Sequence, residues 1–303
     1  MKRIAIQFAI LMLQFHLVAG DAGTPWMPVS HQVPGPGDPK VYQRMVQILQ
    51  DPQLLMQEIK LMNGSDTING FLARPKKSGR FPAVIVVPGD PGLTAYTRVT
   101  TAQLAQAGFA ALSVDLFSRA ARIQDIQEAR RIYFDVMSDP LTLQDLQSAI
   151  DFLNQQQLVQ TGGVGVVGFC LGGRYALLLS ALSPDVRATV AFYGPITLQS
   201  GLANIASGRP VKIVNHDMSP MDFVPWIRTP VQGHYSKRDE GIPVADVQAF
   251  ESSLRTKGAH ADFFVYDAPS HFHSFHEALY DPSAADLAWS RTIDFLRHHL
   301  AKR

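Results

Sequence analysis

The stretch from Gly163 to Arg174 constrains the fold of this 303-residue chain more than any other. It reads GVGVVGFCLGGR. Its β-branched valines, separated only by glycine, predict a buried strand, and the residues from Tyr175 to Ala181 are mostly good helix formers. The change from strand to helix falls between Gly168 and Gly173, so the backbone must turn sharply there. The stretch therefore predicts a strand, a tight turn and a helix in direct succession.

The turn contains Cys170, the single cysteine of the chain, which excludes any intramolecular disulfide. Glycines two residues before and after it give G-x-C-x-G, the nucleophile elbow pattern G-x-S-x-G with cysteine in the serine position. We expect a Cβ at Gly168 or Gly172 to meet the opposite arm of the turn. At a helix N-terminus the partial positive charge favours the thiolate. The alternative interpretation is a buried structural thiol.

Apolar segments and helical patterns alternate along the rest of the chain. Strands are predicted at 81–87, 109–115, 189–193, 229–234 and 262–266, and helices at 93–108, 244–257 and 284–300. Before them we expect a helix at 41–56 and a hairpin of 58–62 with 68–72. This alternation predicts an α/β fold, a mostly parallel sheet with helices on both faces.

The segment from Gly168 to Gly173 resembles the G-x-C-x-G-G signature of the dienelactone hydrolase family (carboxymethylenebutenolidases), a branch of the α/β-hydrolases. The similarity extends from about residue 68 to residue 299. It implies an α/β-hydrolase fold, a small-molecule ester or lactone substrate and no cofactor. In that fold the nucleophile, acid and histidine follow in this order, each on a loop beyond the carboxyl end of a strand.

The resemblance also indicates the partners of Cys170. The loop after the strand at 229–234 is similar to the family's G-x-x-D-x-x-V-P element, with Asp239 in the acid position; a solvent-exposed turn carboxylate is the alternative, and Glu240 lies next to it. His271 matches the family's Y-P-G-A-x-H spacing, and His273 is the second candidate. In such a triad the thiolate attacks a carbonyl, the imidazole takes and returns a proton, and the carboxylate fixes the imidazole tautomer.

The tetrahedral oxyanion needs preorganised donors. One is expected to be the backbone N–H of Leu171, and the other comes from the turn after the strand at 81–87. Pro91 has no N–H, which leaves Gly89 or Asp90, and Asp90 is our assignment. The family resembles H-E-I-F-G-L in this turn, so this chain has Gly89 at the glutamate position, with Asp90 one residue further on.

Substrate-binding residues are predicted less directly. The family archetype holds a substrate carboxylate with two arginines; one falls on Phe275 here and is absent. Arg130 or Arg131 is the candidate for the other, with an ordinary surface arginine as the alternative. The long connection 194–228 includes Trp226 and is a candidate cap over the pocket, with plain surface packing as the alternative. These departures leave the native substrate open. A thioesterase, a general carboxylesterase and a non-catalytic ligand-binding relative are the alternatives.

Charge and histidine spacing weigh against other classes. The net charge is +1 without a basic block, so nothing favours nucleic acid. His271, His273 and His276 are a rival metal cluster. The chain has no H-E-x-x-H motif, and the nucleophile elbow already accounts for the histidine, so we expect no metal. The oligomeric state is not predicted.

The first 22 residues are expected to be a signal peptide, because Lys2 and Arg3 precede the apolar run 4–19 and small residues follow it. This predicts a periplasmic or secreted protein without stable membrane association after cleavage, or a cytoplasmic one if the start site is misassigned. Residues 23–57 are expected to form a proline-rich linker and a helix, and residues 58–303 the hydrolase domain.

Overall fold

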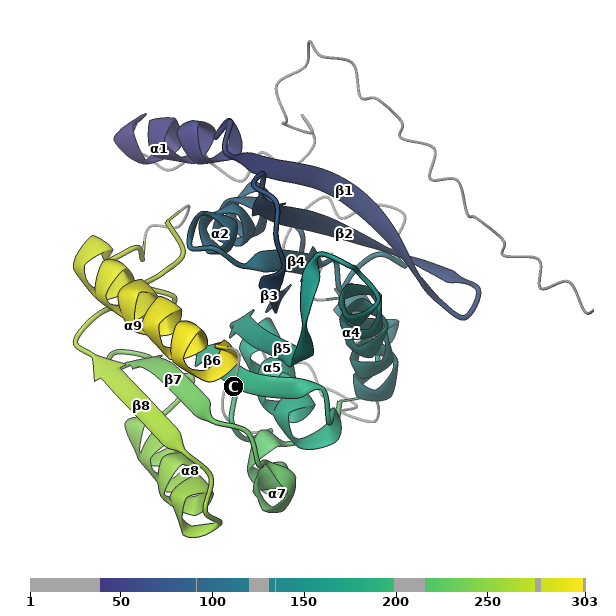
Figure 1. The fold of residues 1–303 in the computed structure, drawn as a ribbon. Coiled ribbons are helices and arrows are strands. Elements are labelled where there is room, and N and C mark those ends of the chain that lie inside the picture. Colours follow the sequence, from purple (N-terminus) through teal and green to yellow (C-terminus); the bar gives the residue numbers. More distant parts are fainter. Residues whose placement is uncertain are drawn as a thin grey trace, which may run out of the picture.

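The computed structural model describes residues 39–90, 92–119, 131–133, 135–198, 216–275 and 279–301. In them an eight-stranded sheet has the order β1-β2-β4-β3-β5-β6-β7-β8 (Figure 1). The strands are β1 Leu54–Asn63, β2 Asp66–Pro75, β3 Phe81–Val87, β4 Ala110–Val114, β5 Val159–Phe169, β6 Val186–Phe192, β7 Val231–Ser236 and β8 Ala261–Tyr266. Pairing is antiparallel for β1 with β2 and β2 with β4, and parallel from β4 to β8. The predicted mostly parallel sheet is confirmed.

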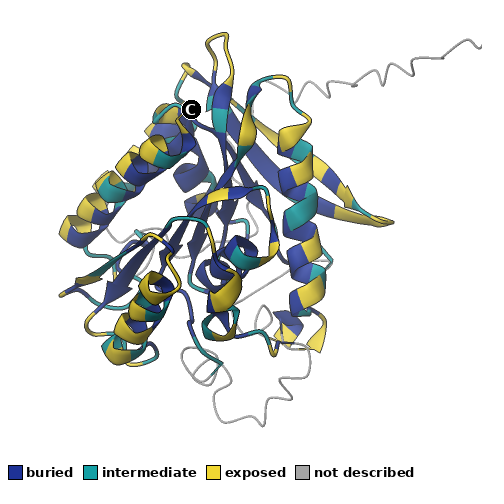
Figure 2. Ribbon diagram, turned by 60° about the horizontal axis from the view of Figure 1, so that its bottom comes forward, coloured by how far each residue is buried: buried dark blue, intermediate teal, exposed yellow. Residues whose placement is uncertain are grey.

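Helices cover both faces of the sheet (Figure 1). They are α1 Pro39–Leu49, α2 Ala95–Gln106, α4 Asp139–Asn154, α5 Leu171–Leu182, α7 Pro220–Phe223, the 3₁₀ helix η2 Val224–Trp226, α8 Val244–Thr256 and α9 Pro282–Leu300. Figure 2 shows the central strands buried between helices whose outer surfaces are exposed. None of the helices in the described ranges is long and apolar enough to cross a membrane.

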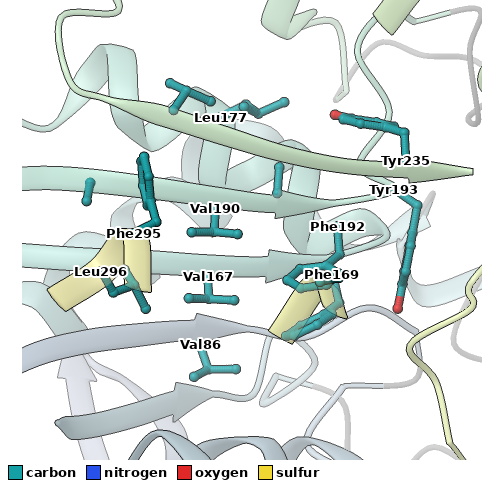
Figure 3. Close-up of a cluster of buried hydrophobic side chains, with 14 of the residues drawn as sticks. Val86, Val167, Phe169, Leu177, Val190, Phe192, Tyr193, Tyr235, Phe295 and Leu296 are labelled. Atoms are coloured by element: carbon teal, nitrogen blue, oxygen red, sulfur yellow. The ribbon is translucent and has the colours of Figure 1, made fainter. Parts of the chain in front are cut away.

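The two faces of β3 show why this strand is a continuous apolar run. Val84 and Val86 belong to the core cluster that includes side chains of α2 and α9. Ala83, Ile85 and Val87 belong to the cluster that includes side chains of α4 and α5. Since successive side chains of a strand point to opposite faces, both faces must be apolar when helices cover both. Figure 3 shows part of the first cluster, in which Val86, Val167 and Val190 lie side by side on adjacent strands near Phe295 and Leu296 of α9.

The N-terminal boundary differs from the expectation. The helix predicted at 41–56 ends at Leu49, and β1 begins at Leu54, paired along its length with β2. Pro52 lacks the N–H that would continue the helix, and the residues from Leu54 onward pair with β2 instead. α1 packs through Met45 and Ile48 into a cluster with residues of β2 and α2. The sheet therefore starts before residue 58, and α1 is part of the domain packing. The expected signal peptide, 1–22, lies outside the described residues.

Capping side chains fix where several helices begin. Thr94 accepts a hydrogen bond from the N–H of Thr97 at the start of α2, and Ser138 accepts one from Leu141 at the start of α4. Asp281 does the same for α9. These caps satisfy backbone donors that a helix leaves unpaired. The first residue of α4, Asp139, directly follows its cap and is fully buried.

Candidate active site

Cys170 lies between β5 and α5 in a strained backbone conformation. Its φ is 51° and its ψ is −119°, in the left-handed half of the map that side chains other than glycine rarely adopt. The residue is partly exposed, whereas residues 164–169 of the strand before it and the first turn after it are buried. Strain of this kind persists only where the surrounding structure enforces it. The predicted strand, turn and helix are confirmed, and the buried structural thiol does not fit this exposure.

The two glycines of the turn are required for different reasons. A Cβ on Gly168 would lie 2.1 Å from the carbonyl oxygen of Gly172, on the opposite arm, as predicted. A Cβ on Gly172 would lie 2.0 Å from the carbonyl oxygen of Val87 in the neighbouring strand β3. The second glycine is therefore required by the close approach of α5 to β3, and the expectation that it faces the opposite arm was wrong.

Backbone hydrogen bonds hold the turn. The N–H of Cys170 donates to the carbonyl oxygen of Phe192 on β6 at 3.0 Å, and the N–H groups of Gly173 and Arg174 donate to the carbonyl oxygen of Cys170 at 2.9 and 3.2 Å. The N–H of Leu171 donates to no acceptor in the described part of the chain. A buried donor at a helix N-terminus beside a thiol is available to stabilise an anion.

The turn after β3 lies directly beside the thiol. A Cβ on Gly89 would come within 3.0 Å of the Cβ of Cys170 and 3.1 Å of the carbonyl oxygen of Phe169. The N–H of Gly92 donates to the carbonyl oxygen of Gly89 at 2.8 Å, which closes a turn around Asp90. At the position of the family's glutamate, this chain therefore has a glycine in close contact with the nucleophile elbow. Asp90, the next residue, is partly exposed.

Asp239 lies just beyond the carboxyl end of β7. Its Oδ1 accepts hydrogen bonds from the N–H groups of Gly241 and Ile242 at 2.9 and 3.2 Å, which fix the loop. Asp239 is partly buried, whereas the neighbouring Glu240 is exposed. Burial raises the pKa of the nearby Tyr235, and the charge of Asp239 raises it further. Two backbone donors therefore fix the Asp239 carboxylate in a loop where it is less exposed than Glu240.

His271 and His273 occupy different environments although they are two residues apart. His271 is partly exposed and has a φ of 57°, and its carbonyl oxygen accepts from the N–H of Ser274 at 2.8 Å. Its ring lies 4.9 Å from the ring of Tyr193, which directly follows β6. The Tyr193 hydroxyl lies 3.3 Å from the hydroxyl of Ser274, so one side chain contacts both ends of the histidine turn.

His273 is buried behind the elbow. Its Nδ1 lies 2.7 Å from the Tyr96 hydroxyl, and its ring stacks on that of Phe169 at 5.3 Å. Burial lowers the pKa of His273 to about 3, so it is neutral at ordinary pH. The stacking brings the histidine turn against the residue that precedes Cys170. Of the two candidates, only His271 is open to solvent; His276 lies outside the described residues.

Three non-glycine residues in the described ranges have positive φ: Cys170, Tyr193 and His271. They follow β5, β6 and β8, and Asp239 follows β7. Parallel strands bring their carboxyl ends to one edge of the sheet, where ligands bind in open α/β folds. Sequence reasoning missed Tyr193, because the strand predicted at 189–193 includes it, whereas β6 ends one residue earlier at Phe192. The structure thus gathers the predicted residues at one edge.

The predicted substrate-binding residues fare differently. Arg130 lies outside the described residues, and Arg131 is an exposed surface residue 4.0 Å from Asp135. Phe275 packs its ring 4.7 Å from that of Tyr96. None of these observations provides a cation for a substrate carboxylate.

The assignment of Trp226 to the substrate pocket is not supported. Its side chain is 60% exposed and lines a groove of about 820 Å³ together with Gly163, Pro184 and Leu300. Gly163 lies in the first half of β5, Pro184 precedes β6 and Leu300 ends α9, so the groove is on the side of the sheet edge opposite Cys170. The described end of the connection, α7 and η2, packs against α5 before the chain enters β7.

In the described ranges no group of three or more His, Cys, Asp or Glu side chains is arranged to hold a metal ion. Cys170, His271 and Asp239 place a thiol, an imidazole and a carboxylate at this edge, beside the backbone donors of the elbow. That set is suited to acyl transfer.

Comparisons with known proteins agree with this geometry. Residues 68–300 match the model of the dienelactone hydrolase family. A Bradyrhizobium sp. protein assigned as a 2-oxo-3-(5-oxofuran-2-ylidene)propanoate lactonase is 34% identical over 241 residues, 78% of this chain and 92% of the relative. A Methylorubrum extorquens protein assigned as a carboxymethylenebutenolidase is 29% identical over 250 residues, 81% and 82% of the two chains.

A solved structure has the same architecture. The crystal structure of a Klebsiella pneumoniae protein assigned as a dienelactone hydrolase superposes with a TM-score of 0.71 at 27% identity, covering 80% of this chain and 98% of that one. The family match extends over most of the sheet and all the residues gathered at its carboxyl edge. This chain belongs to the dienelactone hydrolase family, within the α/β-hydrolases, and is a carboxylic ester or lactone hydrolase.

Proposed function

We propose that the chain hydrolyses a small ester or lactone through a triad of Cys170, His271 and Asp239. The observation that supports this most is the strained, partly exposed Cys170 at the start of α5, beside a Leu171 N–H that donates to none of the described residues. His271 is the solvent-open imidazole of a turn packed against Phe169 and Tyr193. Asp239 is the partly buried carboxylate of the preceding loop.

The reaction has two halves. The Cys170 sulfur attacks the substrate carbonyl, a C–S bond forms, and the resulting oxyanion collapses to break the C–O bond of the ester. His271 takes the proton of the Cys170 thiol and gives that proton to the leaving alkoxide. His271 then takes a proton from water, the hydroxide attacks the thioester carbonyl, and the C–S bond breaks. The proton on His271 returns to the Cys170 sulfur, and the carboxylic acid is released. In a lactone the leaving alkoxide stays joined to the acid, so one hydroxy acid is the product.

Backbone groups near Cys170 suit the oxyanion. The N–H of Leu171 is the first donor, because it lies at the helix N-terminus and donates to no acceptor among the described residues. We assign the N–H of Asp90 as the second, since a Cβ added to the preceding Gly89 would come within 3.0 Å of the Cys170 Cβ and Pro91 has no N–H. The helix N-terminus also favours the thiolate over the thiol.

The expected substrate is a neutral or weakly charged ester or lactone. Phe275 stands where the family archetype has an arginine, and it packs on Tyr96. Gly89 replaces the family's glutamate and leaves no room for a side chain without movement of the elbow. The relatives' names point to lactones, one of them a lactonase of an oxofuranylidene acid. We therefore infer ester or lactone hydrolysis with a substrate that differs from dienelactone.

Substitution of the nucleophile tests the proposal. Wild type, Cys170→Ala and Cys170→Ser are assayed on a panel of lactones, aryl esters and thioesters. We expect Cys170→Ala to lose at least about a thousandfold in kcat, because a covalent step disappears. The panel also separates a lactonase from a thioesterase by the ratio of kcat/KM values. Activity of Cys170→Ala within tenfold of wild type would exclude the thiol mechanism.

We further propose export, with residues 1–22 as a cleaved signal peptide. The basic start, the apolar run and the small residues after it support this. Expression of the full chain in a bacterial host, followed by mass measurement of the mature N-terminus in the periplasmic fraction, tests it. A periplasmic protein that starts between residues 20 and 24 supports cleavage, and an intact cytoplasmic chain contradicts it.

A further inference from the structure

A fully buried ionic network lies one helical turn from Cys170. Arg174 and Asp139 have no exposed surface. Their side chains form a bidentate pair, Nη1 to Oδ1 at 2.7 Å and Nη2 to Oδ2 at 2.6 Å. Arg174 belongs to the first turn of α5, and Asp139 is the first residue of α4. The pair therefore joins the starts of two helices.

Asp139 accepts three more hydrogen bonds. The hydroxyl of Tyr175 donates to Oδ1 at 2.9 Å, the N–H of Met218 donates to Oδ2 at 3.0 Å, and Nδ1 of His216 lies 3.2 Å from Oδ1. Burial alone would raise the pKa of Asp139, but the hydrogen bonds from Arg174 and His216 outweigh it and hold this pKa below its usual range. The carboxylate is therefore charged and fully engaged.

His216 joins a further segment to the network. Its Nε2 lies 2.6 Å from the carbonyl oxygen of Tyr133, and its ring stacks on the Tyr133 ring at 4.0 Å. A backbone carbonyl only accepts hydrogen bonds, so Nε2 carries a hydrogen, and the carboxylate that faces Nδ1 is also an acceptor. The His216 ring thus bridges the Asp139 carboxylate and the backbone of Tyr133.

The network contacts the nucleophile elbow through the backbone. The N–H of Arg174 donates to the carbonyl oxygen of Cys170 at 3.2 Å, and its Nη2 donates to the carbonyl oxygen of Met218 at 2.5 Å. Tyr133, Asp139 and Met218 are thereby tied to the first turn of α5. That turn includes Leu171, whose N–H we assign to the oxyanion.

Stability alone does not account for such an arrangement. Replacing a buried ion pair by apolar side chains of similar volume is often neutral or stabilising. The Nε of Arg174 is also buried without a hydrogen-bond partner among the described residues, which adds a cost. What a bidentate pair supplies instead is a fixed geometry, because the planar guanidinium matches a carboxylate in one orientation. Geometry matters most where oxyanion donors must lie within a few tenths of an ångström.

We propose that Arg174, Asp139 and His216 are positioning residues that hold the first turn of α5, and with it Cys170 and the Leu171 N–H, in the reactive geometry. This deepens the proposed function and depends on it. The network itself contacts no substrate. Its loss changes kcat more than KM, because misplaced oxyanion donors affect the transition state more than substrate binding.

The test compares Arg174→Met and Arg174→Lys with Asp145→Asn as a matched control. Asp145 also lies on α4, is 2% exposed and pairs with Arg119, but its other side-chain partner is Asn63 of the β1 strand. Measurements are kcat and KM on an activated aryl ester, the rate of Cys170 alkylation by iodoacetamide, and the melting temperature. Asp145→Asn should lower the melting temperature and leave kcat and alkylation within about twofold of wild type.

We expect Arg174→Met to lower kcat by about tenfold to a hundredfold with KM changed less than about threefold. Its alkylation rate should change by at least about threefold, and Arg174→Lys should recover part of both losses. If Arg174→Met does not fold, the positioning role is tested with His216→Gln, because this variant leaves the Arg174–Asp139 pair intact. The kcat of His216→Gln should fall about threefold.

Wild-type kcat and alkylation in folded Arg174→Met, or wild-type kcat in His216→Gln, would overturn the positioning role. Failure of the proposed function has a different signature, continued hydrolysis by Cys170→Ala. The alkylation rates report on the elbow without requiring hydrolysis, so the two failures are distinguishable.

Discussion

Gly168→Ala is the substitution whose effect the structure defines best. The added Cβ would lie 2.1 Å from the carbonyl oxygen of Gly172, 2.5 Å from its carbonyl carbon and 2.8 Å from the N–H nitrogen of Gly173. All three are backbone atoms, so no side chain can rotate away. Ordinary contact begins at about 3.4 Å, and the two arms must separate by roughly 1.3 Å to reach it. The backbone dihedrals of Gly168 are not themselves in the positive-φ region, so this contact is the whole perturbation.

The consequences follow from that separation. Overpacking of this kind typically destabilises a domain by about 1–3 kcal/mol. A shift of about 1 Å also takes the Leu171 N–H out of the 2.7–3.1 Å range that an oxyanion donor needs, which costs about a hundredfold in kcat. We therefore expect a protein that still folds but has lost most of its activity.

The control is Gly258→Ala, in the turn after α8. A Cβ there meets nothing within 4 Å, but the φ of Gly258 is +81°, so alanine costs about 1 kcal/mol through backbone strain alone. Urea unfolding measures both destabilisations, and kcat is measured well below the unfolding transition. Gly258→Ala should keep wild-type kcat. If Gly168→Ala also keeps kcat within twofold of wild type, the description of the elbow as a tight, strained turn is wrong.

Three further predictions concern the acid and histidine loops. His271→Gln should lower kcat by at least about a hundredfold, while His273→Gln should keep most of the activity, and equal losses would contradict the assignment of the base. His273 should also matter for acid stability: burial lowers its pKa to about 3 in the folded chain against an ordinary 6.5, so only the unfolded chain takes up that proton between these values. The contribution of His273 to the free energy of unfolding is then full above about pH 6.5 and falls as the pH drops towards 3. In urea unfolding between pH 4 and 6, His273→Gln should reduce the slope of the unfolding free energy against pH by about 1.4 kcal/mol per pH unit. An unchanged slope would contradict the buried neutral ring. Asp239→Asn should lower kcat by at least about tenfold and Glu240→Gln by less than twofold, and the reverse order would move the acid to Glu240.

The sequence predicts the elbow and the sheet well because both depend on local signals. The glycines on either side of Cys170 favour a tight turn, and the apolar run of β3 favours a buried strand, without reference to distant residues. Chain order then places Asp239 and His271 at the same edge, because parallel strands end there.

The missed features depend on distant contacts. Whether His271 or His273 faces solvent depends on Tyr96 and Phe169, which come from other parts of the chain. Trp226 lies at the opposite edge, and no periodic pattern in the sequence around it indicates that position. The pairs of Asp139 with Arg174 and with His216 span 35 and 77 residues, and no spacing rule connects them.

The thiol mechanism can be tested most directly by trapping the acyl-enzyme. Wild type and His271→Gln are mixed with an activated aryl ester, quenched in acid within the first turnover and digested for mass spectrometry. We predict the acyl mass on the peptide that contains Cys170, with more of it in His271→Gln if deacylation slows more than acylation. An acyl group on another residue, with Cys170 unmodified while hydrolysis proceeds, would contradict the account.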